Sequence, residues 1–356
     1  MNHCLLSNTP GFLINNRTIS AAQPCYIIAE VGVNHNGKID LALEHIRQAK
    51  AAGADAVKFQ TFRADKIVVE NAPKADYQAS ATGSGSQKEM LKKLELTDHE
   101  FRTVREECNE LDIDFISTAF DSESLQQVLL LDPACLKWPS GEINNIGFLR
   151  EAAQTGKPIL LSTGTAHMSE VAKAVELCAA ENNVAVAILQ CVSSYPAAIE
   201  DQNLLTLHTM REAFNLPTGF SDHSIGITAA IGARALGMSV LEKHFTLDKN
   251  MPGPDHKASI EPTEFREMVA SIRAIESAFG SGIKRPVPSE QEIARLARKS
   301  LVYNRTLAKG ETLEIQDLTT KRPGTGVPPE AIELFLGKRL NKDVKQDQLA
   351  SFLDLS

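Results

Sequence analysis

The sequence predicts an α/β fold, a (β/α)₈ barrel followed by a small β-rich domain. Short apolar runs alternate eight times with amphipathic, helix-like stretches, several of which end in glycine. A Gly/Pro-rich break then precedes a final segment of short strand signals and turns. The chain of 356 residues, 43% hydrophobic, is long enough for one large core and a smaller one. An open, doubly wound sheet is the alternative arrangement.

Each element can be justified in chain order. The expected strands are CYIIAEV (25–31), AVKFQT (56–61), DFISTA (114–119), CLKWPS (135–140), PILLST (158–163), VAVAILQC (184–191), PTGFSD (217–222) and SVLEKHF (239–245). The clearest helix patterns between them cover 40–53, 97–112, 145–156, 169–182 and 225–237. The polar, Gly/Ser-rich stretch 62–96 is expected to be a long loop over one barrel mouth. The expected domains are a barrel (1–280), a linker (281–295) and a small domain (296–356).

Composition excludes several classes of function. Lys+Arg total 37 against Asp+Glu 45, a formal charge of −8, and no basic block occurs, so neither nucleic acid nor an anionic membrane is an expected partner. The six cysteines lack C-x-x-C spacing, which argues against a zinc site and a disulfide framework. The N-terminus lacks a signal peptide pattern, and no apolar stretch is long enough to span a membrane. A cytoplasmic protein is expected.

Polar side chains gather toward the carboxyl ends of the expected strands, where barrel enzymes place their active sites. They are Glu30, Lys58, Gln60, Ser117, Thr118, Lys137, Ser140, Ser162, Thr163, Gln190, Ser221, His223, Glu242 and His244. Since side chains alternate along a strand, Lys58 and Gln60 share a face, as do Glu242 and His244. A single lysine or histidine at a strand end is more often structural than functional. Buried charge is costly without a partner or ligand, so the coincidence predicts a polar site in the barrel mouth.

The residue types indicate two kinds of binding. His223 and His244 end neighbouring strands and suit a loosely held divalent ion better than a closed zinc site; the alternative is that one is an acid/base histidine. Lys58 and Lys137, with hydroxyls from Thr118, Ser140 and Ser221, could cradle a phosphate and a carboxylate, although such hydroxyls also cap helices. For three further residues, spacing alone favours a structural role. It indicates that Tyr195 is a packed aromatic, Asp255 a turn residue and Arg322 a solvent-exposed charge.

Eight motifs resemble the sialic acid synthase family over residues 25–350. They are AEVGVNHNG (29–37), VKFQTF (57–62), NAPKADYQ (71–78), PSGEINN (139–145), QCVSSYP (190–196), GFSDHS (219–224), LEKHFTLDKNMPGPDH (241–256) and TKRPGTG (320–326). The resemblance implies a barrel joined to an antifreeze-like (SAF) domain. It also implies an enzyme that condenses phosphoenolpyruvate with an N-acylated mannose-type sugar to a nine-carbon sialic acid, releasing phosphate.

The resemblance also implies roles for individual residues. His223 and His244 would bind the metal, Mn²⁺ in preference to Mg²⁺ or Co²⁺, and Glu242 would move a proton beside it. The residues around phosphoenolpyruvate would be Lys58, Thr118, Lys137, Ser140, Ser193 and Ser221. Those facing the sugar would be Glu30, Gln60, Tyr195, Asp255 and, from a partner subunit, Arg322, which implies a domain-swapped homodimer.

Three residues depart from the family pattern, and the acceptor stays open. Trp138 replaces an isoleucine on the flank of the phosphate site, Ser193 an asparagine and Gln190 a histidine. The product is expected to be N-acetylneuraminate; the alternative is a legionaminate or pseudaminate derivative made from a diacetamido-trideoxy hexose.

Three other functions stay open for such a barrel. Another phosphoenolpyruvate-condensing synthase, taking a phosphorylated aldose, generally lacks the appended domain. A metal-dependent aldolase or isomerase would not need phosphoenolpyruvate. A non-catalytic carbohydrate-binding protein fits the dense ionisable cluster least.

Overall fold

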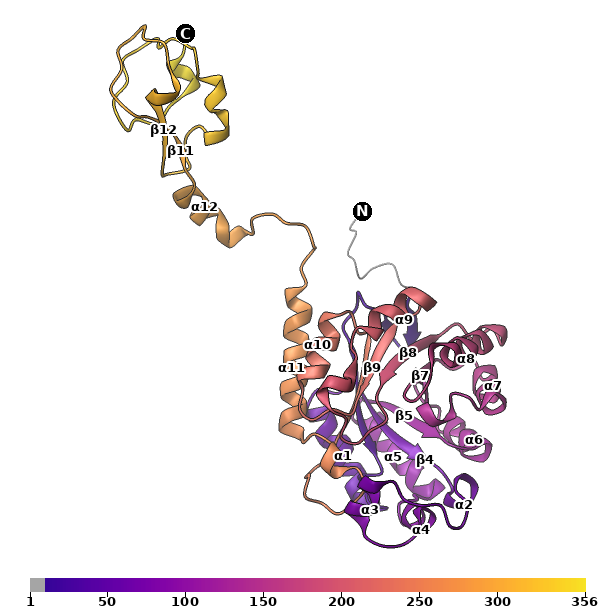
Figure 1. Cartoon of the computed structure of the whole chain (residues 1–356). Helices are drawn as coiled ribbons and strands as arrows, with labels where there is room; N and C mark the ends of the chain where they lie inside the picture. Colours follow the sequence, from indigo (N-terminus) through magenta and orange to yellow (C-terminus); the bar gives the residue numbers. More distant parts are fainter. Residues whose placement is uncertain (1–9) are drawn as a thin grey trace. The chain divides into compact units, whose positions relative to one another are not determined.

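The computed structural model describes residues 10–356 and confirms the predicted architecture. Eight parallel strands close into a barrel in the order β10-β3-β4-β5-β6-β7-β8-β9 (Figure 1). The strands are β3 (Tyr26–Gly32), β4 (Ala56–Thr61), β5 (Asp114–Ala119), β6 (Leu136–Trp138), β7 (Ile159–Ser162), β8 (Val186–Cys191), β9 (Thr218–Asp222) and β10 (Val240–His244). The expectation that no signal peptide is present falls largely on residues 1–9, which lie outside the described residues.

Helices surround the barrel. They are α1 (Ile39–Ala51), α5 (Asp98–Glu110), α6 (Ser122–Leu130), α7 (Ile146–Gln154), α8 (Met168–Ala180), α9 (Thr206–Phe214), α10 (Thr228–Ala235) and α11 (Pro262–Ala278). Of these, α1, α5, α7, α8 and α10 lie close to the five predicted ranges. Gly53 and Gly237 follow α1 and α10 with φ values of +92° and +90°. Glycine adopts this left-handed region at no steric cost, which explains why both helices end there.

Alternation along each strand separates an outer core from the barrel interior. On β4, Val57 and Phe59 pack outward in one cluster with side chains of α1 and α5, as predicted. Lys58, between them, is buried on the opposite face. The same parity holds on β10, where Leu241 and Phe245 belong to the outer core.

An N-terminal hairpin that the sequence analysis missed closes the amino end of the barrel. Strands β1 (Phe12–Ile14) and β2 (Arg17–Ile19) pair antiparallel. Their Ile14 and Ile19 belong to the apolar cluster of the barrel interior, with Ile28, Ile116 and Leu160 among its members. The turn residue Asn15 has a φ of 47°, a conformation that asparagine tolerates in tight hairpin turns. The Asn-Asn pair was therefore the sequence signal for this hairpin.

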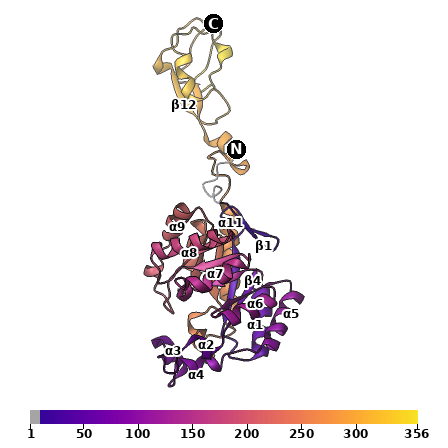
Figure 2. The same ribbon diagram turned by 90° about the vertical axis from the view of Figure 1, so that its right-hand side faces the viewer.

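The segment 62–96, expected to be one long loop, instead contains three short helices joined by turns, which corrects that prediction. The helices are α2 (Ala64–Ile67), α3 (Asp76–Thr82) and α4 (Gln87–Lys92). In α4, the Ser86 side chain accepts from the Glu89 amide and Glu89 bonds back to the Ser86 amide, a capping box visible in the sequence as S-x-x-E. Figure 2 shows α2–α4 at the end of the barrel opposite the β1 hairpin.

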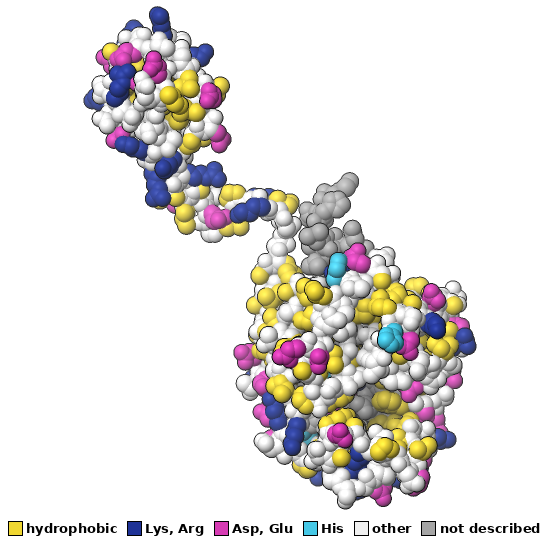
Figure 3. All heavy atoms as spheres, viewed as in Figure 1, with side chains coloured by type: hydrophobic (Ala, Val, Ile, Leu, Met, Phe, Trp, Pro, Cys, Tyr) yellow, Lys and Arg dark blue, Asp and Glu magenta, His cyan; other side chains and the backbone are white. Residues whose placement is uncertain are grey.

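The chain divides into two compact units between Gly282 and Ile283. The second contains α12 (Gln291–Ala297) and a sheet of β11 (Ser300–Tyr303) and β12 (Leu318–Lys321), with further isolated bridges. Its core includes Leu301, Tyr303 and Phe335. On the face drawn in Figure 3, positive and negative side chains are interspersed over the barrel unit. Within residues 10–356, no helix has the length and apolarity needed to cross a membrane.

Candidate active site

A cavity of about 260 Å³ lies at the carboxyl ends of the barrel strands. It brings together thirteen of the fourteen predicted site residues: Glu30, Lys58, Gln60, Thr118, Lys137, Ser140, Ser193, Tyr195, Ser221, His223, Glu242, His244 and Asp255. The fourteenth, Arg322, belongs to the second unit, where it is exposed and its Nε donates to the Ala297 carbonyl oxygen at 3.1 Å. The individual roles of these residues stay predictions.

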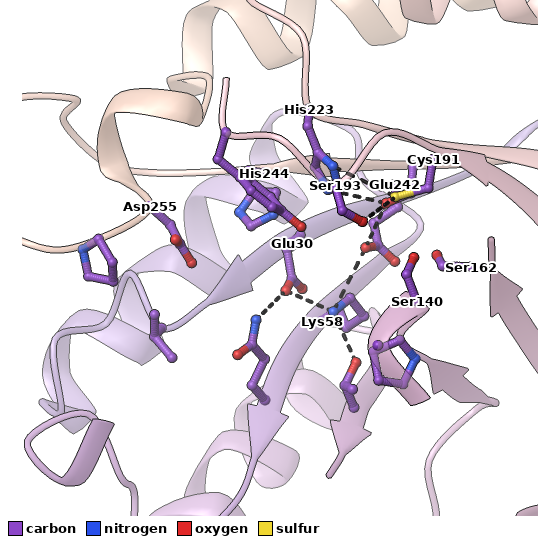
Figure 4. Close-up of a pocket in the computed structure, with 18 of the residues that line it drawn as sticks. Glu30, Lys58, Ser140, Ser162, Cys191, Ser193, His223, Glu242, His244 and Asp255 are labelled. Carbon is purple, nitrogen blue, oxygen red and sulfur yellow. Dashed lines mark hydrogen bonds and ion pairs between the residues drawn. The ribbon is translucent and has the colours of Figure 1, made fainter. Parts of the chain in front are cut away.

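Lys58 lies at the centre of the cavity, between two carboxylates (Figure 4). Its Nζ is 2.7 Å from Glu30 Oε1 and 3.9 Å from Glu242 Oε1, and it donates to Thr118 Oγ1 at 3.1 Å. Gln60 Nε2 donates to Glu30 Oε1 at 3.2 Å. Burial raises the pKa of Glu30 to about 7, although Lys58 acts in the opposite direction. Glu30 can therefore give or take a proton near neutral pH.

Glu242 is the second carboxylate of the cavity, and it stays ionised. Burial opposes its ionisation, but Lys137 and Lys58 hold its pKa below the usual range. Its Oε2 is 3.7 Å from Lys137 Nζ, and its Oε1 accepts from Ser221 Oγ at 3.2 Å. Burial lowers the pKa of Lys137. The two carboxylates thus differ in protonation, as the acid and base of one reaction require.

Hydroxyl groups line the end of the cavity near Lys137. Figure 4 shows Ser140 and Ser162 there, with Asp255 at the far end. Ser140 Oγ accepts from the Gly164 amide at 2.9 Å. A Cβ on Gly164 would lie 2.2 Å from Ser193 Oγ and 2.8 Å from Ser140 Oγ, so only glycine leaves room for these hydroxyls. This end is suited to a small anion.

Two residues of this end were not among the predicted site residues. Ser162 was noted only as a polar residue at a strand end, and its Oγ now lines the cavity. Cys191 lies in the quoted QCVSSYP motif, and its Sγ is 3.7 Å from His223 Nδ1. Burial raises the pKa of the Cys191 thiol, but His223, Lys137 and Ser140 together bring it down to about 7.

Four buried polar atoms of the cavity lack a hydrogen-bond partner among residues 10–356. They are Glu30 Oε2, Glu242 Oε2, His244 Nδ1 and Ser162 Oγ. Buried polar atoms are nearly always satisfied, because leaving one unpaired costs about 1–3 kcal/mol. Their concentration in one cavity indicates a site built for a polar ligand.

The two imidazoles predicted to bind metal lie side by side, with ring centroids 5.3 Å apart. His223 Nδ1 is 2.7 Å from the Val192 carbonyl oxygen. When Nδ1 donates there, Nε2 presents its lone pair to the cavity. Burial lowers the pKa of His244 well below its usual range, so this ring is neutral, as a ligand must be. At His223 burial also opposes protonation, but Cys191 raises the pKa, so a cation would have to displace that proton.

A metal ion would need further ligands from outside the chain. Within the described residues, no three His, Cys, Asp or Glu side chains are grouped as a metal site. Two imidazoles would fit an open, loosely held ion that completes its shell with water and substrate oxygens, and they do not fit a closed zinc centre.

The far end of the cavity is built by Asp255 and the helical insertion. Burial raises the pKa of Asp255 to about 6. Tyr77 of α3 packs on Tyr195, with ring centroids 5.3 Å apart. An apolar flank consists of Val33, Met90, Leu91 and Phe120. Tyr77 and the neighbouring Gln78 were missed because the sequence analysis treated their segment as an unstructured loop, although they lie in the quoted NAPKADYQ motif.

Two of the three departures from the family pattern do not face the cavity, contrary to expectation. Trp138 points away from Lys137 into the outer core, where its ring centroid is 4.6 Å from that of Phe148. Gln190 donates from Nε2 to the Gln202 carbonyl oxygen at 3.0 Å. Each neighbours a residue that faces inward, and alternation turns it outward. Of the three, only Ser193 lines the cavity.

The fold and site define a class: barrel proteins whose strand ends form a buried, charged site for a small polar ligand. A model of the NeuB family matches residues 45–284, and a model of the SAF domain matches residues 298–356. The chain therefore belongs to the NeuB family, and both the predicted resemblance and the appended domain are confirmed.

Individual relatives cover nearly the whole chain. The N,N'-diacetyllegionaminic acid synthase of Legionella pneumophila is 42% identical over 341 residues, 93% of this chain and 96% of the relative. The enzyme of the same name from Campylobacter jejuni is 44% identical over 328 residues, 91% and 98% of the two chains. The crystal structure of N-acetylneuraminic acid (sialic acid) synthetase from Leptospira borgpetersenii has a TM-score of 0.71 and 33% identity, covering 80% of this chain and 95% of that one.

Proposed function

We propose that this chain condenses phosphoenolpyruvate with an N-acylated mannose-type aldose, forming a nine-carbon ulosonic acid and phosphate. One observation carries the proposal: a single cavity with the buried Lys58 at its centre joins an anion-binding end, with the buried Lys137 and several hydroxyls, to an end with Asp255, two tyrosines and an apolar flank. The first end suits the donor and the second suits a sugar. The names of the relatives support the same reaction class.

Lys58 and Lys137 bind the anionic donor in this proposal. Their ammonium groups are buried, so each interacts with a phosphate or carboxylate more strongly than in water. Thr118, Ser140, Ser193 and Ser221, with Ser162, provide hydroxyls around them. As the carbon–oxygen bond to phosphate breaks, the same lysines stabilise the charge on the leaving group.

The two carboxylates handle protons. The methylene carbon of phosphoenolpyruvate bonds to the aldehyde carbon, and Glu30, with its pKa of about 7, donates a proton to the aldehyde oxygen as it becomes a hydroxyl. Water then adds at the donor's second carbon, and Glu242 accepts the proton that this water loses. The carbon–oxygen bond to phosphate then breaks, the new hydroxyl group gives its proton to the departing phosphate, and the remaining C=O group completes the keto acid.

A divalent ion completes the site, held by His223 and His244; Mn²⁺ is the expected ion, and Mg²⁺ and Co²⁺ are the alternatives that imidazole and oxygen ligands also accept. When bound, it supplies Lewis-acid polarisation of the acceptor aldehyde. Gln60, Tyr195 and Asp255 orient the sugar. Arg322 completes the acceptor site of a second copy in a domain-swapped homodimer; the KRPG motif and the exposure of Arg322 support this assignment.

Two acceptors fit this scheme, and two observations favour the second. N-acetylmannosamine would give N-acetylneuraminate, and a diacetamido-trideoxy hexose would give a diacetyllegionaminate. The relatives at 42% and 44% identity are named for the latter product. The apolar flank of Val33, Met90, Leu91 and Phe120 suits a deoxygenated sugar carbon better than a hydroxymethyl group.

Phosphate release from phosphoenolpyruvate with Mn²⁺ tests the proposal, with each acceptor supplied separately. Turnover is expected with both or with one, and faster with the diacetamido-trideoxy hexose. Acceptor cleavage or isomerisation without phosphoenolpyruvate would favour the aldolase or isomerase alternative. No phosphate release with either sugar, from Mn²⁺-loaded protein, would contradict the proposed reaction.

A further inference from the structure

A fully buried ion pair lies on the outer face of the two strands that carry the histidines. Lys243 Nζ is 2.8 Å from Asp222 Oδ2, and neither side chain has any exposed surface (0%/0%). The two residues are register partners across β10 and β9. Alternation turns them away from the cavity, into the outer core that contains Leu241 and Phe245.

This ion pair also holds the backbone on both sides of His223. Asp222 Oδ1 accepts from the Ser224 amide at 2.8 Å and from Ser224 Oγ at 2.6 Å. Lys243 Nζ donates to the Ser224 carbonyl oxygen at 2.5 Å. One ammonium group therefore contacts both chain neighbours of His223, while its own residue is the chain neighbour of His244.

Stability alone does not account for such a pair. Removing two charges from water costs about as much as their attraction returns, and well-packed apolar residues often serve a core equally well or better. Apolar residues, however, would not form the hydrogen bonds and the ion pair that tie the turn at 222–224 to β10 in one fixed geometry. Outer contacts that orient metal ligands typically change metal affinity by about 10- to 100-fold.

We propose that Asp222 and Lys243 are positioning residues that fix the spacing of the His223 and His244 imidazoles for a divalent ion. The proposal rests on the proposed function, since it presumes that both histidines bind metal. Neither residue touches the cavity, so their effect reaches the ion through the backbone.

The test is Mn²⁺ affinity, measured by electron paramagnetic resonance on the full chain without substrates, alongside the melting temperature. The double variant Asp222→Asn/Lys243→Met removes both charges together. It is expected to melt near the wild-type temperature but to bind Mn²⁺ about 10- to 100-fold more weakly. Excess Mn²⁺ should then restore most of the wild-type kcat.

Two further variants keep the test decisive. Glu276→Gln breaks a different buried pair, in which Arg234 Nε is 3.0 Å from Glu276 Oε1, and should lower the melting temperature without changing Mn²⁺ affinity. Ser224→Ala removes only the hydroxyl bonded to Asp222, buries no unpaired charge and should weaken Mn²⁺ binding several-fold. If the double variant does not fold, the Ser224→Ala result decides.

The outcomes separate the two proposals. Unchanged Mn²⁺ affinity in the folded double variant, or in Ser224→Ala, would overturn the positioning role and leave the proposed function intact. Wild-type protein that binds Mn²⁺ but releases no phosphate would overturn the proposed function, while weakened Mn²⁺ binding in the variants would still support the positioning role. Wild-type protein that binds no Mn²⁺ would overturn the metal site and the positioning role together.

Discussion

The carboxylates buried at the two ends of the barrel differ in how completely they are hydrogen-bonded. At the amino end, Asp55 accepts from Arg17 at 2.5 Å, from Arg273 at 3.0 Å and from the Ile27 amide at 2.9 Å. At the carboxyl end, Glu30 and Glu242 each keep one oxygen that has no hydrogen-bond partner in the described part of the chain, residues 10–356. The contrast teaches how to distinguish a structural network from a binding site: a completed network stabilises the fold, whereas an incomplete one awaits a ligand.

The largest effect should follow from removing a cation at the carboxyl end. Lys137→Met deletes a donor-binding ammonium whose contacts within the protein are long, 3.4 Å to the Trp138 carbonyl oxygen and 3.7 Å to Glu242 Oε2, and kcat should fall by about 10²–10³. Unfolding free energy should change little. Steady-state phosphate release and urea unfolding measure the two quantities. Lys157→Met, at a half-exposed lysine that precedes β7 and pairs with Asp132, is the control and should leave kcat unchanged.

The opposite pattern is expected at the amino end. Asp55→Asn removes two ion pairs from a completed network, and the free energy of unfolding should fall by about 1–3 kcal/mol. The folded variant should keep its kcat/KM, because the network lies at the end of the barrel away from the cavity. A loss of activity larger than the loss of folded protein would erase the distinction between the two ends.

The pH dependence of stability sharpens the comparison. Burial raises the pKa of Glu30 from 4.5 to about 7, so the folded state binds more protons than the unfolded state between these values. The Glu30 contribution to stability is therefore fully present below about pH 4.5 and is lost as pH rises through about 7. Glu30→Gln should flatten this fall, gaining stability relative to wild type between pH 5 and 8. Parallel stability curves would show that Glu30 is ionised throughout.

The smallest effect is expected at the hydroxyl cradle. A methyl group on Gly164 would displace the Ser193 and Ser140 hydroxyls, so Gly164→Ala should raise the KM for phosphoenolpyruvate about tenfold, equivalent to ~1.4 kcal/mol. Unfolding free energy and the KM for the sugar should stay near wild type. An unchanged donor KM would remove these hydroxyls from the anion site.

Sequence periodicity predicted the barrel because each strand carries its own signal. On β4, Val57 and Phe59 pack in the apolar outer core. Because side chains alternate along a strand, Lys58 and Gln60 must point the other way, into the barrel. The same rule, applied to Trp138, would have turned it away from Lys137. Trp138 therefore packs on Phe148 in the outer core.

Other features depend on contacts between distant segments, and local patterns do not contain them. Ile14 and Ile19 of the β1–β2 hairpin pack against side chains from several distant strands at the amino end of the barrel. The local sequence around them contains no sign of those partners. Cys191 resembles any buried cysteine until His223, from the next strand, lies beside it. The packing of Tyr77 on Tyr195 likewise joins residues from separate elements.

The helical insertion between β4 and α5 has an evolutionary consequence. The anion-binding end of the cavity comes from strand ends and the short turns after them, which are locked into the barrel, whereas Tyr77, Gln78, Met90 and Leu91 come from one excursion of the chain. Such a segment can be replaced as a unit. Its replacement would change the specificity for the sugar while the chemistry at the donor stays the same. Grafting it between relatives offers a route to new nine-carbon sugars without redesigning the barrel.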